Sequence, residues 1–267
     1  MKNKLLAIFA SLLLAGCAST TDGGLVGESG SQLLLVSADT MEKSALTAYS
    51  STLSEAKSKH ILNPNSAQTQ RVRNIANRLI AQVGVFRKDA LKWDWQVNVI
   101  KEDTINAWCM PGGKIAVYTG IIEKLNLTDG ELAAVMGHEI AHALREHSRE
   151  RASQDQLRKV GIFAVSSATG LGSTSQSLLE MASQYTIALP FSRSHETQAD
   201  RIGTELMARA GYNPYDAVSV WQKMSKLSKS STPQIMSTHP SHESRIADLT
   251  EVAKKVMPLY EAAKAGR

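Results

Sequence analysis

The stretch His138-Glu139-Ile140-Ala141-His142 sets two imidazoles and one carboxylate at helical spacing, and it is the most informative feature of the chain. Residues four apart on an α-helix lie one turn apart on the same face, so both imidazoles can reach one metal ion. Glu139 is too close to His138 to bind that ion easily, but it can take a proton from a water held in the open position of the metal. This is the H-E-x-x-H pattern of metalloproteases, and it predicts a hydrolytic zinc site.

The residues before this motif predict the helix that it needs. Thr128 and Glu131 have the spacing of a capping box, in which each side chain accepts from the backbone N–H of the other residue. Apolar residues then follow at helical spacing: Leu132, Val135, Met136 and Ile140. A polar, solvated helix with incidental His and Glu residues is the alternative, and the apolar flank argues against it.

A catalytic zinc ion takes three protein ligands, so a third must come from elsewhere. A metzincin would need Gly and His where this chain has Arg145 and Ser148, which excludes that class. His147 lies nine residues after His138, half a turn round a continuous helix, and is expected at the surface. Glu146 is on a usable face of the helix, but it lies farther along the helix axis from His138 than one metal ion can bridge. A second helix must therefore supply the third ligand.

The stretch Phe191-Ser192-Arg193-Ser194-His195-Glu196-Thr197-Gln198-Ala199-Asp200 is the candidate for that helix. Glu196 and Asp200 are four apart and share a face, so Glu196 can bind the metal while Asp200 holds the second ring nitrogen of a histidine. This is the gluzincin arrangement. An ordinary charged face paired with Arg193 and Arg201 is the alternative, and the upstream motif favours the metal.

Several ordered blocks, spanning about residues 70 to 250, carry a resemblance to a known family. They are Asn106-Ala107-Trp108-Cys109-Met110-Pro111-Gly112-Gly113, His138 to His142, Ser192-Arg193, Glu196 to Asp200, Ala210-Gly211-Tyr212-Asn213-Pro214, Thr238-His239-Pro240 and Arg245-Ile246. Together they resemble the zinc metallopeptidases that include HtpX, the CAAX prenyl proteases, the mitochondrial Oma-type proteases and the periplasmic LoiP and BepA proteins. Among the soluble bacterial members, the chain looks most like the LoiP-type lipoproteins.

The resemblance implies a role for each matching residue. His138, His142 and Glu196 would bind one zinc ion, and Glu139 would be the general base. His239 would lie near the metal, where it donates to the oxyanion or fills the open coordination position at rest; a histidine satisfied by backbone is the alternative. Arg245 would add positive charge near the same oxyanion.

The remaining periodicity predicts an α+β fold, mainly helical and zincin-like, with a small sheet or hairpin beside the H-E-x-x-H helix. Helices are expected from 69 to 84 and from 240 to 262, and strands over 93–100 and 114–118 around the Pro111-Gly112-Gly113 turn. We expect the second strand to offer a free edge to substrate through Ile115, Ala116, Val117 and Tyr118, with a plain buried hairpin as the alternative. Over 150–190 a helix-loop-helix is favoured over a mobile cover or a membrane-dipping segment.

The N-terminus predicts a lipoprotein. Lys2 and Lys4 precede a short apolar run, as in a signal peptide, and Leu14-Ala15-Gly16-Cys17 has the form of a lipobox. By similarity to lipoproteins, cleavage leaves Cys17 acylated. In a cell with two membranes, Ala18 rather than Asp after the cysteine predicts sorting to the outer one, by the usual lipoprotein rule. We therefore expect a signal peptide over 1–16, a lipidated flexible tether over 17–45 and a catalytic domain over 46–267.

Cysteine content and charge limit the other possibilities. Lipidation would consume Cys17 and leave Cys109, expected to be a buried apolar residue, so the mature chain has no internal disulfide. A formal net charge of +5 with scattered positive residues does not favour nucleic acid as a partner.

The sequence as a whole predicts a zinc endopeptidase of the cell envelope. Its expected substrates are misfolded or misassembled envelope polypeptides, with envelope assembly machinery as a further possible partner. Two other classes stay open. One is a non-catalytic zinc-binding chaperone or assembly factor of outer-membrane proteins, against which Glu139 argues. The other is a metal hydrolase of a non-protein polymer such as cell wall.

Overall fold

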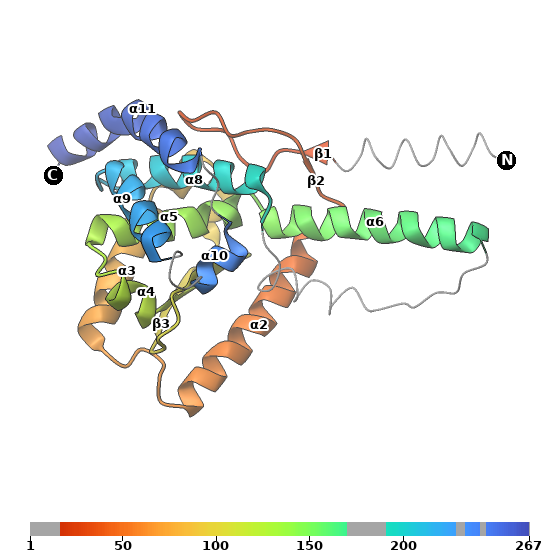
Figure 1. The fold of residues 1–267 in the computed structure, drawn as a ribbon, viewed down its shortest axis with the longest axis horizontal. Coiled ribbons are helices and arrows are strands. Elements are labelled where there is room, and N and C mark those ends of the chain that lie inside the picture. The colour runs from red at the N-terminus through yellow and green to blue at the C-terminus, as the bar shows by residue number, and fades with distance from the viewer. Residues whose placement is uncertain (1–16, 170–190, 228–232, 241–243, 267) are drawn as a thin grey trace.

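The computed structural model describes residues 17–169, 191–227, 233–240 and 244–266 (Figure 1). The predicted signal peptide over 1–16 lies outside the described residues, as does the segment 170–190 within the interval for which a cover was considered. Among the described residues, no helix combines the length and the apolar character that crossing a bilayer requires.

Two helices that pack on each other form the centre of the fold, α5 (Asp129–Leu144) and α8 (Arg193–Arg209). The predicted capping box of Thr128 and Glu131 is present at the start of α5. Gly203 allows the close approach, because a Cβ there would lie 2.7 Å from the backbone nitrogen of His138. The two predicted metal-binding motifs therefore face each other across a close helix contact.

Three helices cover this pair. The central helix α5 packs against α3 (Ser66–Ile80) and α9 (Tyr215–Leu227), and α11 (Arg245–Ala265) lies on α8 and α9 (Figure 1). The buried face of α3 carries Val72, Ile75, Ala76 and Leu79, which agrees with the helix predicted from 69. The predicted closing helix is α11, although it begins at Arg245 rather than at residue 240.

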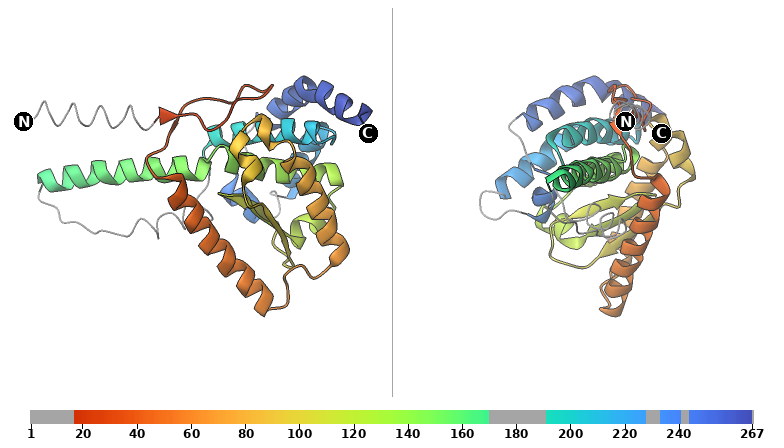
Figure 2. Two further views of the ribbon diagram at one scale, coloured as in Figure 1. Left: turned by 180° about the vertical axis from the view of Figure 1, so that it is seen from behind. Right: turned by 90° about the vertical axis from the view of Figure 1, so that its right-hand side faces the viewer.

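Shorter elements connect these helices, and α6 extends beyond them. The short ones are η1 (Val83–Val85), η2 (Lys88–Lys92), α4 (Thr119–Lys124) and α10 (Gln234–Thr238). The helix α6 (His147–Thr169) follows α5 after a break and projects from the helical body (Figure 2).

A three-stranded sheet lies beside α5, in the order β3 (Gln96–Ile100), β5 (Lys114–Tyr118) and β4 (Ala107–Met110). The strand β5 pairs with β3 in parallel and with β4 antiparallel. The predicted mainly helical α+β fold with a small sheet is confirmed.

The central place of β5 corrects one prediction. Ile115, Ala116, Val117 and Tyr118 are paired on both sides, so the free edge predicted for them is wrong. The cause is the unpredicted strand β4, which the turn with left-handed Gly112 (φ 76°) and Gly113 (φ 79°) folds back onto β5. The free edge on this side of the sheet therefore belongs to β4.

The N-terminal segment before α2 packs on the domain, and the prediction of a flexible tether over 17–45 is wrong for this stretch. The backbone N–H groups of Leu25 and Val26 donate to the buried carboxylate of Glu205, at 3.0 and 2.8 Å. The buried guanidinium of Arg145 donates to the hydroxyl of Thr21 and to the carbonyl of Gly30. Because buried polar groups need partners, these contacts make the segment part of the folded unit.

Two elements complete the N-terminal part. Strands β1 (Cys17–Ala18) and β2 (Gln32–Leu33) form a short antiparallel pair. The helix α2 (Ala38–Ser58) is capped by the Ser37 side chain and therefore begins inside the predicted tether. Its buried residues include Met41, Ala45 and Tyr49, and it contacts β4 and β5.

Candidate metal centre

Four buried side chains converge at one point between α5, α8 and the end of α10. They are His138, His142, Glu196 and His239, and their ligand atoms all lie within 4.8 Å of one another. His138 Nε2 is 3.1 Å from His142 Nε2 and 3.2 Å from His239 Nδ1. The sequence predicted these four residues near one metal ion, and the fold brings them together.

The donor set and its spacing fit one zinc ion. Nitrogen and oxygen ligands at about 2.0–2.1 Å from a tetrahedral zinc ion are about 3.3 Å apart. The Glu196 carboxylate oxygens lie 3.4 Å from His142 Nε2, 3.5 Å from His138 Nε2 and 3.0 Å from His239 Nδ1. Three imidazoles and one carboxylate are also ligand types that zinc prefers.

The predicted contact between Asp200 and a first-helix histidine is present. Asp200 Oδ1 lies 2.9 Å from His138 Nδ1, the ring nitrogen that does not face the cluster. Burial lowers the pKa of His138, but hydrogen bonds to Asp200 and Glu196 outweigh it and raise that pKa to about 9. The carboxylate therefore orients the ring with Nε2 toward the metal position.

Arg245 contacts the two carboxylates Glu196 and Asp200. Its Nη1 donates to Glu196 Oε2 at 2.9 Å and its Nη2 to Asp200 Oδ1 at 2.7 Å. The guanidinium carbon also lies 3.2 Å from the centroid of the Trp221 ring. Because each terminal nitrogen donates to a carboxylate, Arg245 holds these two side chains in place.

His147 is buried, so the prediction of a surface histidine is wrong. Its Nδ1 lies 2.9 Å from Nδ1 of His142. The prediction assumed one continuous helix, whereas α5 ends at Leu144, Glu146 has a left-handed backbone (φ 49°) and α6 begins at His147. The sequence around this break contains neither Gly nor Pro, so no local signal announced it.

Glu139 faces a small cavity of about 30 Å³ beside the cluster. Its other lining residues are Asn106, Ala107, Trp108, Cys109, His142, Ser148, Arg151, Phe191, Thr238 and His239. Glu139 Oε1 is buried without a hydrogen-bond partner among the described residues, and His239 Nε2 lies 3.4 Å from it. Burial raises the pKa of Glu139, which makes its carboxylate a stronger base.

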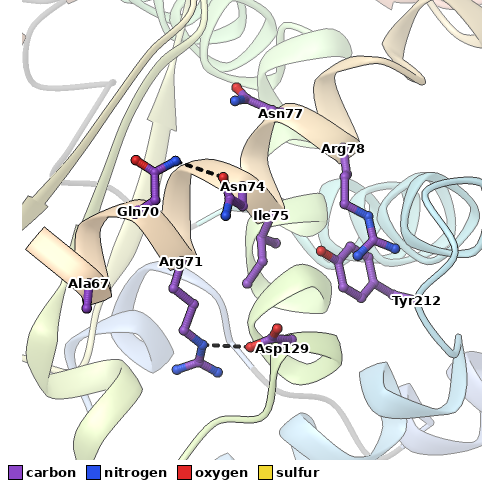
Figure 3. Close-up of a pocket in the computed structure, with 9 residues that line it drawn as sticks. All are labelled: Ala67, Gln70, Arg71, Asn74, Ile75, Asn77, Arg78, Asp129 and Tyr212. Carbon is purple, nitrogen blue, oxygen red and sulfur yellow. Dashed lines mark hydrogen bonds and ion pairs between the residues drawn. The ribbon is translucent and has the colours of Figure 1, made fainter.

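A larger hollow of about 750 Å³ lies along α3, next to the start of α5 and the turn after α8, and is lined by none of these residues (Figure 3). Its walls are joined by the Arg71–Asp129 ion pair, at 2.6 Å, and by Arg78, which donates to the carbonyl of Ala210 and stacks on Tyr212. These contacts attach α3 to the start of α5 and to the turn after α8. This hollow follows the seam between helices, away from the metal centre.

Comparison with known proteins agrees with the site. Residues 66–253 match the model of Peptidase family M48. The chain is 35% identical over 175 residues to mitochondrial metalloendopeptidase OMA1 of Arabidopsis thaliana, covering 65% of this chain and 35% of that protein. It is 34% identical over 219 residues to OMA1 of Schizosaccharomyces pombe, covering 81% of this chain and 62% of that one.

A bacterial relative is more distant. The chain is 28% identical over 207 residues to the beta-barrel assembly-enhancing protease of Escherichia coli K12, covering 72% of this chain and 40% of that protein. The chain thus spans less than two thirds of the length of each of these three relatives. The family match extends over most of the chain and includes every member of the buried cluster, and the chain therefore belongs to peptidase family M48.

Proposed function

We propose that the chain is a zinc-dependent endopeptidase that cleaves misfolded or misassembled proteins of the cell envelope. The observation that carries the proposal is the buried Glu139 Oε1, which has no hydrogen-bond partner among the described residues and lies in the cavity beside His142 and His239. A buried carboxylate without a partner is costly unless it is used, and a general base beside a metal has such a use. Family membership supports peptide hydrolysis as the reaction.

Each residue of the site has a distinct part in the proposed reaction. When bound by His138, His142 and Glu196, zinc supplies Lewis acidity that makes a water molecule acidic near neutral pH. Glu139 takes the proton from that water and passes it to the leaving amine. Asp200 and Arg245 hold the ligand side chains in orientation, and Arg245 is a positioning residue rather than an oxyanion donor.

We assign His239 to the open side of the site. Its Nδ1 lies in the cluster, and its Nε2 points toward Glu139. This ring would therefore help to hold the zinc ion at rest, and it would donate to the oxyanion of a bound substrate. Among the described residues, the His239 ring contacts side chains of the site, which favours this role over a histidine satisfied by backbone.

Replacing His239 by Ala is expected to lower turnover by about 10²–10³-fold, the usual cost of one oxyanion donor. Zinc should stay bound, because His138, His142 and Glu196 still supply three ligands. Turnover of a peptide substrate and zinc content after gel filtration measure the two effects separately. Loss of zinc together with activity would instead make His239 a structural ligand.

We further propose that substrate pairs with the free edge of β4. The Tyr118 N–H donates to the Asn106 carbonyl at 3.1 Å, and hydrogen-bonded pairs alternate along antiparallel strands. The main-chain groups of Ala107 and Cys109 therefore face away from β5. Both residues also line the cavity that contains Glu139, so a peptide added to this edge would pass the proposed base.

A proline at residue 109 tests this edge, because it removes an N–H that the β4–β5 pairing does not use. We expect Cys109→Pro to lower kcat/KM by about fivefold, the value of one hydrogen bond of about 1 kcal/mol. Cys109→Ala is the matched control, since it also loses the thiol but keeps the N–H. Equal kcat/KM in the two folded variants would argue against substrate pairing at β4.

The cellular setting is also part of the proposal. The lipobox ending at Cys17 suggests a lipid anchor at the periplasmic face of the outer membrane and a place in the LoiP- and BepA-like branch. The name of the Escherichia coli relative, a beta-barrel assembly-enhancing protease, supports substrates or partners in envelope assembly. The packed segment before α2 would then keep the anchor close to the folded domain.

Hydrolysis of casein by the chain from Ala18 tests the proposed activity. Zinc-loaded protein is expected to cleave casein, to stop after chelation and to resume when zinc is restored, because the base alone does not activate water sufficiently. Circular dichroism and zinc content verify that the protein is folded and loaded. Intact casein with folded, zinc-loaded protein would overturn the endopeptidase and favour the zinc-binding chaperone, for which suppression of aggregation is the assay.

A further inference from the structure

We propose that His147 is the positioning residue of the metal ligand His142, and that it acts by accepting the hydrogen bond of His142 Nδ1. The two Nδ1 atoms lie 2.9 Å apart, and both rings are buried. This inference rests on the zinc site of the proposed function and concerns how that site binds metal, not which bond it cleaves.

Gln198 determines which nitrogen of His147 carries the proton. Its Oε1 lies 2.9 Å from His147 Nε2 and also accepts from Arg145 Nε at 3.3 Å. Arginine can only donate, so the atom of Gln198 at this position is the carbonyl oxygen, and His147 Nε2 must donate to it. A neutral His147 ring then has its lone pair at Nδ1.

The same reasoning fixes the ring of His142. With the His147 Nδ1 lone pair as acceptor, His142 Nδ1 carries the hydrogen, and its Nε2 lone pair faces His138 and Glu196 in the cluster. Only this tautomer can bind the metal through Nε2. The chain of hydrogen bonds from Arg145 through Gln198 and His147 therefore fixes His142 in the tautomer that can bind the metal.

The Nδ1 atoms of the two histidines of the motif thus have different hydrogen-bond partners. His138 is held by the carboxylate of Asp200 and His142 by a neutral imidazole. The usual supports of a metal-binding histidine are carboxylate, carbonyl or water. Glu196 and Asp200 already share one cation, Arg245. A further carboxylate behind His142 would add another buried charge to the site, and a neutral acceptor avoids the cost of burying it.

The His147 ring is itself held in place. It stacks on His195, with centroids 4.4 Å apart and planes 19° apart, and His195 Nε2 lies 3.3 Å from Glu150 Oε2. The neighbouring His142 ring is also packed, because Phe191 stacks on it with ring centroids 4.0 Å apart. His147 approaches His142 from the Nδ1 side, so it does not join the ligand atoms that face the metal position.

Replacement by Asn and by Leu separates the hydrogen bond from packing, because the two side chains have nearly the same shape. The Asn carbonyl oxygen can take the place of Nδ1 as acceptor, whereas Leu offers none. We expect His147→Leu to weaken zinc binding by roughly 10–100-fold, the usual effect of removing such a support, and His147→Asn to restore most of it. Competition with a chromophoric chelator gives the dissociation constants.

Two further measurements make the outcome decisive. The thermal unfolding of the zinc-free variants reports packing, and the visible spectrum of cobalt(II)-loaded protein reports ligand geometry; we expect only the spectrum to separate Leu from Asn. Equal zinc affinity of wild type and His147→Leu would overturn the proposal, as would equal losses in Asn and Leu. If His147→Leu does not fold, Gln198→Met removes the acceptor of His147 and should weaken zinc binding in the same direction.

These measurements need no substrate. A failure of the peptidase proposal would leave the difference in zinc affinity between Asn and Leu intact. A failure of the His147 proposal would leave the casein hydrolysis of the wild type intact.

Discussion

Replacing Glu139 by Gln is expected to slow peptide hydrolysis by about 10²–10⁴-fold, the usual contribution of a general base. Gln keeps the size and polarity of the side chain but cannot take a proton. Glu139 is outside the buried cluster of possible ligands, so zinc affinity should stay close to that of the wild type. Turnover of casein or a peptide, measured on fully zinc-loaded protein, gives the effect.

A second carboxylate serves as control. Glu261 is exposed near the end of α11, far along the chain from the site, and Glu261→Gln should retain wild-type turnover. Wild-type turnover in Glu139→Gln would remove the assignment of Glu139 as base. Loss of zinc in that variant would show that Glu139 contributes to metal binding instead.

Replacing Arg245 by Met is expected to destabilise the zinc-free protein by about 3–5 kcal/mol, the usual cost of leaving buried charges without their partner. Arg245 is 1% exposed and is the cation shared by Glu196, which is 0% exposed, and Asp200, which is 4% exposed. Met fills similar volume without charge. Urea unfolding of the zinc-free protein measures the loss.

The loss of stability caused by Arg245→Met should also depend on bound zinc. A bound zinc ion would supply positive charge next to Glu196, so the loss caused by Arg245→Met should be smaller in zinc-loaded protein than in zinc-free protein. Arg245→Lys keeps the charge but cannot donate to both carboxylates in the same way, and we expect an intermediate loss. An Arg245→Met variant as stable as wild type without zinc would contradict the positioning role.

Local sequence patterns predicted the parts of the site that depend on one helix at a time. The capping box at Thr128, the i and i+4 spacing of His138 and His142, and the same spacing of Glu196 and Asp200 all appear in the structure. These signals succeed because helix geometry fixes which side chains share a face. The prediction that one zinc ion fits this site follows from the same local chemistry.

Predictions that required the path of the chain between elements were less successful. The strand over 114–118 was predicted, but its place at the centre of the sheet was not, because β4 is short and its pairing follows from a turn with two left-handed glycines. The segment before α2 has a polar, glycine-containing sequence, so its contacts with Glu205 and Arg145 could not be predicted from composition.

By itself, the sequence determined the chemistry of the site: two histidines and two carboxylates on helix faces, with Glu139 beside them. Only the tertiary structure decided what holds these ligands in place. The left-handed backbone at Glu146 turns His147 inward, and the position of α11 brings Arg245 between Glu196 and Asp200. The physical reason is that helical periodicity depends only on neighbouring residues. The hydrogen-bond partners of a buried polar group, in contrast, come from segments that are distant in sequence and adjacent only in the folded chain.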